Sequence, residues 1–465
     1  MSYDLVVKGG TVVTASESYP ADIGIRKGKI AAIGELDAKG SKTLDAAGMS
    51  VVPGGIDVHT HFDMPFMGAT TADDFATGSL AAACGGTTTV VDFAIQKKGE
   101  SLLSALELWH EKAQGKAIVD YGFHMIVVDL PDARVKEMDE VVREGSPTFK
   151  LFMAYPGIFM SDDATIFRAM LRTRENGGMI CMHAENGGVI DILVQKAIAA
   201  GQIEPKYHAL TRPMTAEAEA TRRAISLSEM AGVPLYIVHL SAGDAMDEVR
   251  RARERGLPVH AETCPQYLFL SYDDYERPGF EGAKFVMSPP LRPKPNEERL
   301  WNGLRHDWLQ VVSTDHCSFC MKDGVGGKAG KMLGKKSFAK IPNGAPGVET
   351  RLMLLWDAVL DGKLSANRFV EVTATSPAKI MGLYPRKGII APGADADLVV
   401  IDSKKKYTIS AKTHHANVDY NPYEGRTVKC ALKEVLVRGK SVVTNYKPVA
   451  NAPHGSFVKR DPRLN

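Results

Sequence analysis

The sequence predicts an α/β fold, a (β/α)₈ TIM-like barrel with a small β-sandwich domain formed from both chain ends. Three observations predict it. In the middle of the chain, eight short apolar runs alternate with longer helix-compatible segments, the pattern of βα units around a parallel sheet. The first and last parts of the chain both read as short strands with glycine turns. Residues 6–14 also resemble residues 436–444, since each reads as strand, glycine turn and strand.

The two chain ends supply the expected β domain. The expected strands in these two parts are 4–7, 11–13, 22–25, 30–33, 396–401 and 435–437. Gly9-Gly10 and Lys27-Gly28-Lys29 are predicted turns between the first strands. We therefore expect residues 1–51 and 386–465 to form one small β domain, with a barrel of residues 52–385 inserted between its halves.

The middle of the chain supplies eight expected barrel strands. They are 51–56, 87–93, 121–128, 148–153, 178–182, 235–238, 259–262 and 311–313. Asp73-Asp74 is predicted to open a helix that ends at Gly85-Gly86. A second helix is predicted over Thr215–Ala231, opened by Thr215 and closed by Gly232. In such a barrel the chemistry sits at the carboxyl ends of the strands.

Composition and charge exclude several classes of partner. The chain has 465 residues, and 57 Lys and Arg oppose 55 Asp and Glu, so nothing favours a nucleic acid or an anionic membrane as partner. No apolar run reaches the roughly 18 residues that span a bilayer, and the N-terminus has no signal-like core. We expect a cytoplasmic protein. The six cysteines are sparse, and Cys317 and Cys320, a lone C-x-x-C pair, are expected to be free thiols.

Metal-binding residue types follow several of the expected strands. If residues 51–61 form one buried strand, His59 and His61 point to the same face. Lys150 lies inside the fourth strand, His183 and His239 end the fifth and sixth, and Asp315 ends the eighth. One histidine at a strand end is usually structural, but groups on five strands that converge on one barrel mouth favour a metal site. Zinc binds neutral imidazole readily.

Lys150 has two interpretations. A lysine in an apolar strand is costly to bury unless it is paired or neutral. It could form a buried ion pair. It could instead be a neutral amine that captures carbon dioxide, and the carbamate (N6-carboxylysine) would then bridge two metal ions as an anionic ligand with two oxygens.

Longer motifs surround these residues. They are Gly-Gly-Ile-Asp-Val-His-Thr-His-Phe-Asp-Met-Pro-Phe at 54–66, Lys-Leu-Phe-Met-Ala-Tyr at 150–155, His-Ala-Glu-Asn at 183–186, Glu-Thr-Cys-Pro-Gln-Tyr at 262–267, Ser-Pro-Pro-Leu-Arg at 288–292 and Ile-Pro-Asn-Gly at 341–344. With them the chain resembles, essentially end to end, the dihydropyrimidinase and D-hydantoinase family of the amidohydrolase superfamily.

The resemblance implies a cofactor of two Zn²⁺ per subunit, bridged by carbamylated Lys150 and a hydroxide. It places His59, His61 and Asp315 on one ion, and His183 and His239 on the other. Two such ions lower the pKa of a bridging water and polarise the scissile carbonyl. Asp315 would act as general base and then acid. Glu185 and Asn186 are then expected to be structural, and His316 to point away from the site.

The resemblance also implies the substrate contacts. Tyr155 would stabilise the oxyanion through its phenol. Ser288 and Asn343 would hold the cyclic amide edge, largely by main-chain groups. Met64, Phe66, Phe152 and Phe159 are candidates for the apolar wall around the ring substituent, although simple packing at the barrel mouth would explain them equally well.

The implied function is metal-dependent hydrolysis of cyclic amides. Substrates would be dihydropyrimidines (dihydrouracil to N-carbamoyl-β-alanine, in pyrimidine catabolism), 5-monosubstituted hydantoins (to N-carbamoyl amino acids), or both. The sequence leaves open the choice between them, the enantioselectivity and the metal identity. The family is commonly a homotetramer, and the Gly- and Lys-rich residues 321–340 could be a mobile loop or an oligomer contact near the site.

Two other functions fit part of this pattern. A dihydroorotase or allantoinase would also hydrolyse a cyclic amide, but dihydroorotase-like sequences carry an arginine soon after His-x-His, where this chain has Phe62-Asp63-Met64. A non-catalytic interaction protein of the same fold is the other alternative. It is disfavoured because all six ligand positions are filled and Tyr155 is present.

Overall fold

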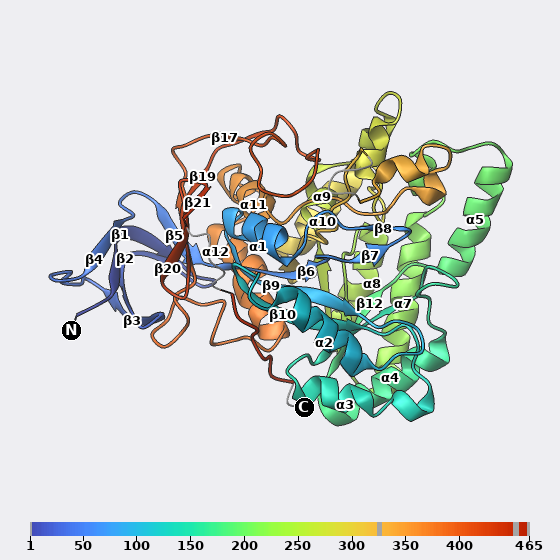
Figure 1. Cartoon of the computed structure of the whole chain (residues 1–465), viewed down its shortest axis with the longest axis horizontal. Coiled ribbons are helices and arrows are strands. Elements are labelled where there is room, and N and C mark those ends of the chain that lie inside the picture. The colour runs from blue at the N-terminus through green and yellow to red at the C-terminus, as the bar shows by residue number, and fades with distance from the viewer. Residues whose placement is uncertain (1, 323–327, 450–454, 463–465) are drawn as a thin grey trace.

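The predicted fold class is confirmed: the chain forms a parallel eight-stranded barrel and a separate β sheet built from both chain ends. The computed structural model describes residues 2–322, 328–449 and 455–462. In Figure 1 the N-terminal strands β1–β4 lie beside the C-terminal strands β19–β21 on one side of the molecule, and the barrel with its helices fills the other side.

The barrel strands follow one another in space in chain order, and each neighbouring pair is parallel. They are β6 (Gly55–Thr60), β9 (Thr87–Ile95), β10 (Asp120–Ile126), β11 (Thr148–Phe152), β12 (Met179–His183), β13 (Leu235–Ile237), β14 (Val259–Thr263) and β15 (Val311–Val312). The segment after β15 closes the ring onto β6, since the His61 N–H donates to the His316 carbonyl at 2.8 Å.

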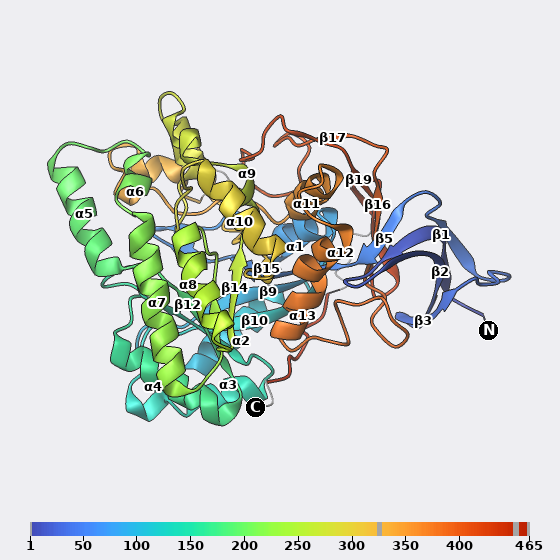
Figure 2. The same cartoon turned by 180° about the vertical axis from the view of Figure 1, so that it is seen from behind.

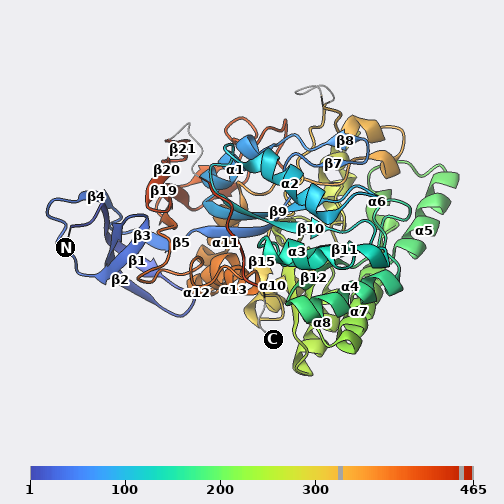
Figure 3. The same cartoon turned by 60° about the horizontal axis from the view of Figure 1, so that its bottom comes forward.

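Helices surround these strands (Figures 2 and 3). The α-helices are α1 (Phe75–Cys84), α2 (Leu102–Ala113), α3 (Glu137–Arg143), α4 (Asp163–Asn176), α5 (Gly187–Ala199), α6 (Tyr207–Leu210), α7 (Met214–Ala231), α8 (Gly243–Glu254), α9 (Pro265–Phe269), α10 (Pro295–Arg305), α11 (Arg351–Leu360), α12 (Ala366–Val370) and α13 (Ser376–Ile380). The two helices expected from the sequence are both present: Asp74 caps α1, and Gly232 ends α7 in the left-handed region. Thr215 does not open α7, because the helix begins at Met214 and Pro213 precedes it.

The second sheet has nine strands in the order β21-β20-β19-β16-β5-β1-β2-β3, with β4 paired to β1. Its strands are β1 (Leu5–Val13), β2 (Ser18–Arg26), β3 (Lys29–Gly34), β4 (Lys42–Asp45), β5 (Ser50–Pro53), β16 (Leu398–Asp402), β19 (Ala431–Val437), β20 (Lys440–Thr444) and β21 (Lys447–Pro448). Two small antiparallel pairs complete the strands: β7 (Pro65–Phe66) with β8 (Ala69–Thr70), and β17 (Tyr407–Thr408) with β18 (Thr427–Val428).

Two expectations from the sequence are wrong in detail. Residues 51–61 are not one strand, because the chain changes sheets at Gly54: β5 pairs with β16, and β6 starts the barrel. A side chain at Gly54 would place its Cβ 2.1 Å from the Thr88 hydroxyl, so only glycine allows this close crossing. Gly9-Gly10 is not a turn. It is an irregularity within the continuous strand β1, whereas Arg438-Gly439 does turn between β19 and β20.

The two domains meet around a buried lysine. Lys387 Nζ lies 2.6 Å from Asp397, 2.7 Å from Asp120 on β10 and 3.2 Å from Asp395, and all four side chains are buried. The carboxylates raise the pKa of Lys387 against the opposing effect of its burial. This cluster joins the base of the barrel to the residues that lead into β16.

The C-terminal residues return to the barrel. The Val458 N–H donates to the Tyr121 carbonyl at 2.7 Å, and the buried Arg460 guanidinium donates to the Thr148 hydroxyl at 2.7 Å. The predicted domain boundaries at residues 51/52 and 385/386 stay a prediction. Among the described residues no helix is both long and apolar enough to cross a bilayer.

Candidate active site

One cavity of about 50 Å³ opens at the carboxyl ends of the barrel strands. Thirteen of its fifteen lining residues are the site residues expected from the sequence: His59, His61, Met64, Phe66, Lys150, Phe152, Tyr155, Phe159, His183, His239, Ser288, Asp315 and Asn343. Ile126 and Cys317 complete the lining. The fold therefore brings all the candidate residues to one place.

His59, His61 and Asp315 form the first group. The Nε2 atoms of both imidazoles lie 3.2 Å from the same Asp315 oxygen, Oδ1. Burial, followed by the nearby Lys150 ammonium, holds the pKa of His59 well below its usual value. The imidazole is therefore neutral, which is the form that binds a metal ion.

His183 and His239 form the second group. His183 Nδ1 lies 2.9 Å from His239 Nε2, so the two rings turn a nitrogen toward the same point. The other ring nitrogen of His183 is 2.9 Å from the buried Glu185 carboxylate. Glu185 therefore fixes the orientation of the His183 ring, as outer carboxylates do for metal-binding imidazoles.

Lys150 lies between the two groups. Its side chain is buried, and its Nζ lies 4.8 Å and 5.0 Å from the ring centres of Phe93 and Phe152. Burial lowers the pKa of Lys150 to about 8 against the opposing charges of Asp315 and Glu262. The lowered pKa increases the share of neutral amine, which is the form that carbamate formation requires.

These donors fit a zinc site. His59, His61 and Asp315 offer ligand atoms that all lie within 4.8 Å of one another. Within the described chain, His59 Nε2 is a buried ring nitrogen with no hydrogen bond, although buried polar atoms are normally paired. Imidazole and carboxylate are ligand types that Zn²⁺ takes in catalytic sites.

Glu262 is the residue that the sequence did not single out. At the end of β14 it contacts His59 Nδ1, accepts the His239 backbone N–H at 2.9 Å and accepts the Tyr236 hydroxyl at 2.8 Å. Burial raises the pKa of Glu262 to about 8. Its place at a strand end was a usable signal, since it shares this place with the histidines and the aspartate.

The cavity lining also includes polar groups that could bind an amide. Asn343 Nδ2 donates to Ser288 Oγ at 3.1 Å and lies 3.4 Å from the Tyr155 hydroxyl. Ser288 Oγ is also 3.2 Å from the buried His208 Nε2. Burial raises the pKa of Tyr155 to about 12, so the phenol keeps its proton and can donate it.

Aromatic side chains form the apolar part of the wall. Phe159 stacks on Phe152 with ring centres 5.0 Å apart and on Phe66 with ring centres 5.9 Å apart. Met64 lies in a neighbouring apolar cluster with Cys317 and Phe319. The rings therefore both pack on one another and face the cavity.

Backbone strain accompanies three of the site residues. Tyr155, His239 and Asp315 have φ values of 64°, 37° and 51°, in the left-handed region that non-glycine residues rarely adopt. Such strain is found where the surrounding structure fixes a side chain for function. Here each of the three residues directly follows a barrel strand or lies a few residues beyond one.

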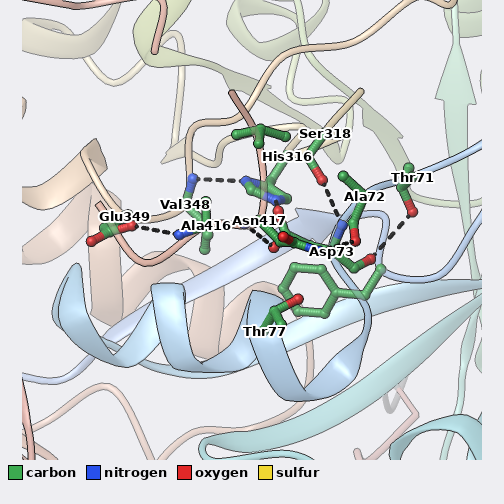
Figure 4. Close-up of polar contacts among 12 residues, drawn as sticks. Thr71, Ala72, Asp73, Thr77, His316, Ser318, Val348, Glu349, Ala416 and Asn417 are labelled. Atoms are coloured by element: carbon green, nitrogen blue, oxygen red, sulfur yellow. Dashed lines mark hydrogen bonds and ion pairs between the residues drawn. The ribbon is translucent and has the colours of Figure 1, made fainter. Parts of the chain in front are cut away.

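His316 points away from the cavity, into a polar network (Figure 4). Its Nε2 lies 3.0 Å from Asp73 Oδ2, and its Nδ1 accepts the N–H groups of Gly347 and Val348 at 3.1 and 3.3 Å. Asp73 Oδ1 accepts the Asn417 N–H at 2.7 Å. Because the His316 backbone bonds to both His59 and His61, this network supports the first group of ligands.

The remaining expectations have simple outcomes. Asn186 caps α5. All six cysteines are free and buried, and burial raises the pKa of Cys317. Residues 323–327 of the Gly- and Lys-rich segment lie outside the described residues, while residues 328–340 form two short turns of helix, η5 (Lys331–Gly334) and η6 (Phe338–Lys340).

The chain is similar to known proteins along most of its length. The amidohydrolase family profile matches residues 50–442. The chain is 52% identical to a D-hydantoinase of Streptomyces coelicolor, covering 99% of this chain and 98% of the relative, and 49% identical to a D-hydantoinase of Geobacillus stearothermophilus, covering 98% and 96%.

Solved structures show the same similarity. The chain superposes on a dihydropyrimidinase from Brevibacillus agri with a TM-score of 0.96 at 49% identity, covering 99% of each chain. It also superposes on an L-hydantoinase (dihydropyrimidinase) from Arthrobacter aurescens with a TM-score of 0.88 at 30% identity, covering 98% of this chain and 100% of the other.

Proposed function

Because the chain belongs to the amidohydrolase family, as an enzyme of the dihydropyrimidinase and D-hydantoinase type, we propose that it hydrolyses the cyclic amide bond of 5-monosubstituted hydantoins and dihydropyrimidines. One observation carries the proposal: thirteen candidate residues for binding metal, amide and ring substituent line a single cavity.

The proposed cofactor is a pair of zinc ions. His59, His61 and Asp315 would hold one ion, His183 and His239 the other, and carbamylated Lys150 would bridge them. Bound zinc would supply a water of lowered pKa and polarise the substrate carbonyl. The lowered pKa values of His59, His239 and Lys150 support this assignment.

Asp315 is the proposed general base and acid. Its carboxylate lies at the centre of the first group, 3.2 Å from two imidazole nitrogens. In the reaction a water oxygen bonds to the carbonyl carbon and the ring C–N bond breaks. Asp315 would take the proton from the water and deliver it to the departing nitrogen, so that one residue serves both halves of the reaction.

Three residues would bind the reacting amide. The Tyr155 phenol, protonated at neutral pH, would donate to the carbonyl oxygen as negative charge develops on it. Ser288 and Asn343, joined to each other at 3.1 Å, would hold the –NH–CO– edge of the ring. These contacts would bind the –NH–CO– edge, which hydantoin and dihydropyrimidine rings have in common.

The rest of the cavity favours an uncharged, apolar substituent. Met64, Phe66, Phe152 and Phe159 would surround the group on the ring. Among the described residues that line the cavity, Lys150 is the sole lysine or arginine. A substrate with an exocyclic carboxylate, as in the dihydroorotase alternative, would therefore have no free cationic partner.

The test is the ratio of kcat/KM for dihydrouracil and for a 5-aryl hydantoin, measured on zinc-loaded protein with bicarbonate present. A ratio that favours the hydantoin would assign the apolar wall to substrate binding. A ratio that favours dihydrouracil would indicate pyrimidine catabolism. Absence of turnover with both, with two zinc ions bound, would refute the proposal. The homotetramer and the cytoplasmic location stay predictions.

A further inference from the structure

Lys331 is a buried lysine that the proposed mechanism does not use. It lies on η5, in the Gly- and Lys-rich segment, and its side chain has no exposed surface. A buried amine needs hydrogen-bond partners to offset its lost hydration. Lys331 Nζ donates to two main-chain carbonyls, that of Val286 at 2.9 Å and that of Pro342 at 3.0 Å.

These two carbonyls belong to the segments that carry the proposed amide-binding residues. Val286 precedes Ser288 by two residues, and Pro342 directly precedes Asn343. The Val286 carbonyl also accepts the Gly344 N–H at 3.0 Å, and the Asn343 side chain donates to Ser288 at 3.1 Å. Lys331 Nζ therefore lies where the two segments meet.

The bond to Pro342 also fixes a main-chain donor. The Pro342 carbonyl and the Asn343 N–H belong to one planar peptide unit, so a bond that holds the carbonyl also holds the direction of the N–H. Burial lowers the pKa of Lys331 to about 7, and the amine has protons for both carbonyls in either protonation state. Hydrogen bonds in a chain also polarise one another, which makes the Asn343 N–H a better donor.

The segment that carries Lys331 is itself anchored. The Lys331 N–H donates to the Cys320 carbonyl at 2.8 Å, and the Phe338 N–H donates to the Ile203 carbonyl at 2.9 Å. A Cβ at Gly334 would lie 2.1 Å from the Ile341 side chain, so the turn packs closely against the segment before Asn343. Lys331 is thus presented to the two carbonyls by a fixed turn.

We propose that Lys331 is a positioning residue for the substrate amide, because it holds the Ser288 and Asn343 segments in one arrangement. This inference rests on the proposed function, in which those two residues bind the cyclic –NH–CO– edge. Lys331 acts through the main chain and does not line the cavity. Its loss should therefore weaken binding of the ring and leave the reacting groups in place.

The test is Lys331→Met, which keeps the apolar stem and removes the donors. For the better substrate of the wild type, we expect KM to rise about tenfold because the two hydrogen bonds that hold the amide-binding segments are lost. We expect kcat to stay within about twofold and zinc content to be unchanged. Hydrogen exchange should also become faster in peptides covering residues 285–291 and 340–347, a readout that needs no substrate.

Lys335→Met is the matched control, since Lys335 is an exposed lysine of the same turn. It should leave KM and exchange at wild-type values. A wild-type KM in Lys331→Met would overturn the inference, whereas an inactive wild type would instead refute the proposed function. If the Met variant does not fold, Lys331→Gln takes its place. A raised KM with a retained kcat in Lys331→Gln would support the inference. A wild-type KM in this variant, or its failure to fold, would overturn the inference.

Discussion

Replacing Asp73 by Asn tests whether the network behind His316 supports the metal ligands. The two oxygens of Asp73 accept two donors, the Asn417 N–H at 2.7 Å and His316 Nε2 at 3.0 Å. His316 Nδ1 already accepts two backbone N–H groups, so its proton must be on Nε2. An Asn side chain would therefore turn an NH₂ group toward one donor in either orientation.

The expected cost follows from this mismatch. The side chain is fully buried, and losing a hydrogen bond to a charged group while leaving a donor unpaired costs about 3 kcal/mol. The entropy of unfolding for 465 residues is about 1 kcal/mol per kelvin, so the melting temperature should fall by about 3 °C. Because the His316 backbone bonds to His59 and His61, zinc affinity should fall about 10- to 100-fold.

Calorimetry and zinc retention during chelator titration measure both effects. Asp74→Asn is the control, since Asp74 caps α1 and Asn caps equally well. The effect should also depend on pH. Burial alone would raise the pKa of Asp73, but its bonds from His316 and Asn417 outweigh burial and lower it. Its stabilisation is therefore present above about pH 4, and the difference between wild type and variant should shrink below that pH.

The reasoning would be refuted if Asp73→Asn matched Asp74→Asn in both melting temperature and zinc retention. A lower melting temperature with unchanged zinc retention would show that the hydrogen bonds of Asp73 stabilise the fold. It would also refute the idea that this network supports the metal ligands.

Three further predictions concern other parts of the molecule. Lys150→Ala should lose most bound zinc and activity, with partial recovery when a short carboxylic acid is added; full zinc and full turnover in elemental analysis and kinetics would contradict the carbamate bridge. Lys387→Met should lower the free energy of unfolding by about 3 kcal/mol in denaturant titration, because it leaves the buried Asp397 carboxylate without its cationic partner, and adding Asp397→Asn should restore part of the loss. Phe159→Ala should raise KM for a 5-aryl hydantoin about tenfold, because ring contacts are lost, and should leave KM for dihydrouracil nearly unchanged. Equal changes in KM for both substrates would show that Phe159 only packs against its neighbours.

Much of the fold and the site could be predicted because the signals are local. Each barrel strand is a short apolar run, and each candidate ligand lies within such a run or no more than three residues beyond it. The change of sheet at Gly54 could not be predicted, because it depends on the approach of Thr88 from another part of the chain. A run of apolar residues does not show which sheet it joins.

The contacts that support the site could not be predicted either, because they join residues that are far apart in the sequence. Glu262 meets His59 from a position 203 residues away, and Lys331 reaches Val286 across 45 residues. Periodicity and residue type identify side chains that can react. They carry no information about which main-chain carbonyl a distant lysine reaches, since that depends on packing after the barrel has closed.

The pairing of β5 with β16 has a consequence for synthesis of the protein on the ribosome. Strand β5 ends at Pro53, and its partner β16 begins at Leu398, so the whole barrel is translated between them. Throughout that time the nascent N-terminal sheet has an open edge of valine-rich backbone, the kind of edge that pairs with other chains. The interval between translation of β5 and of β16 is thus when a newly made chain is most exposed to aggregation, and when a chaperone that covers this edge would act.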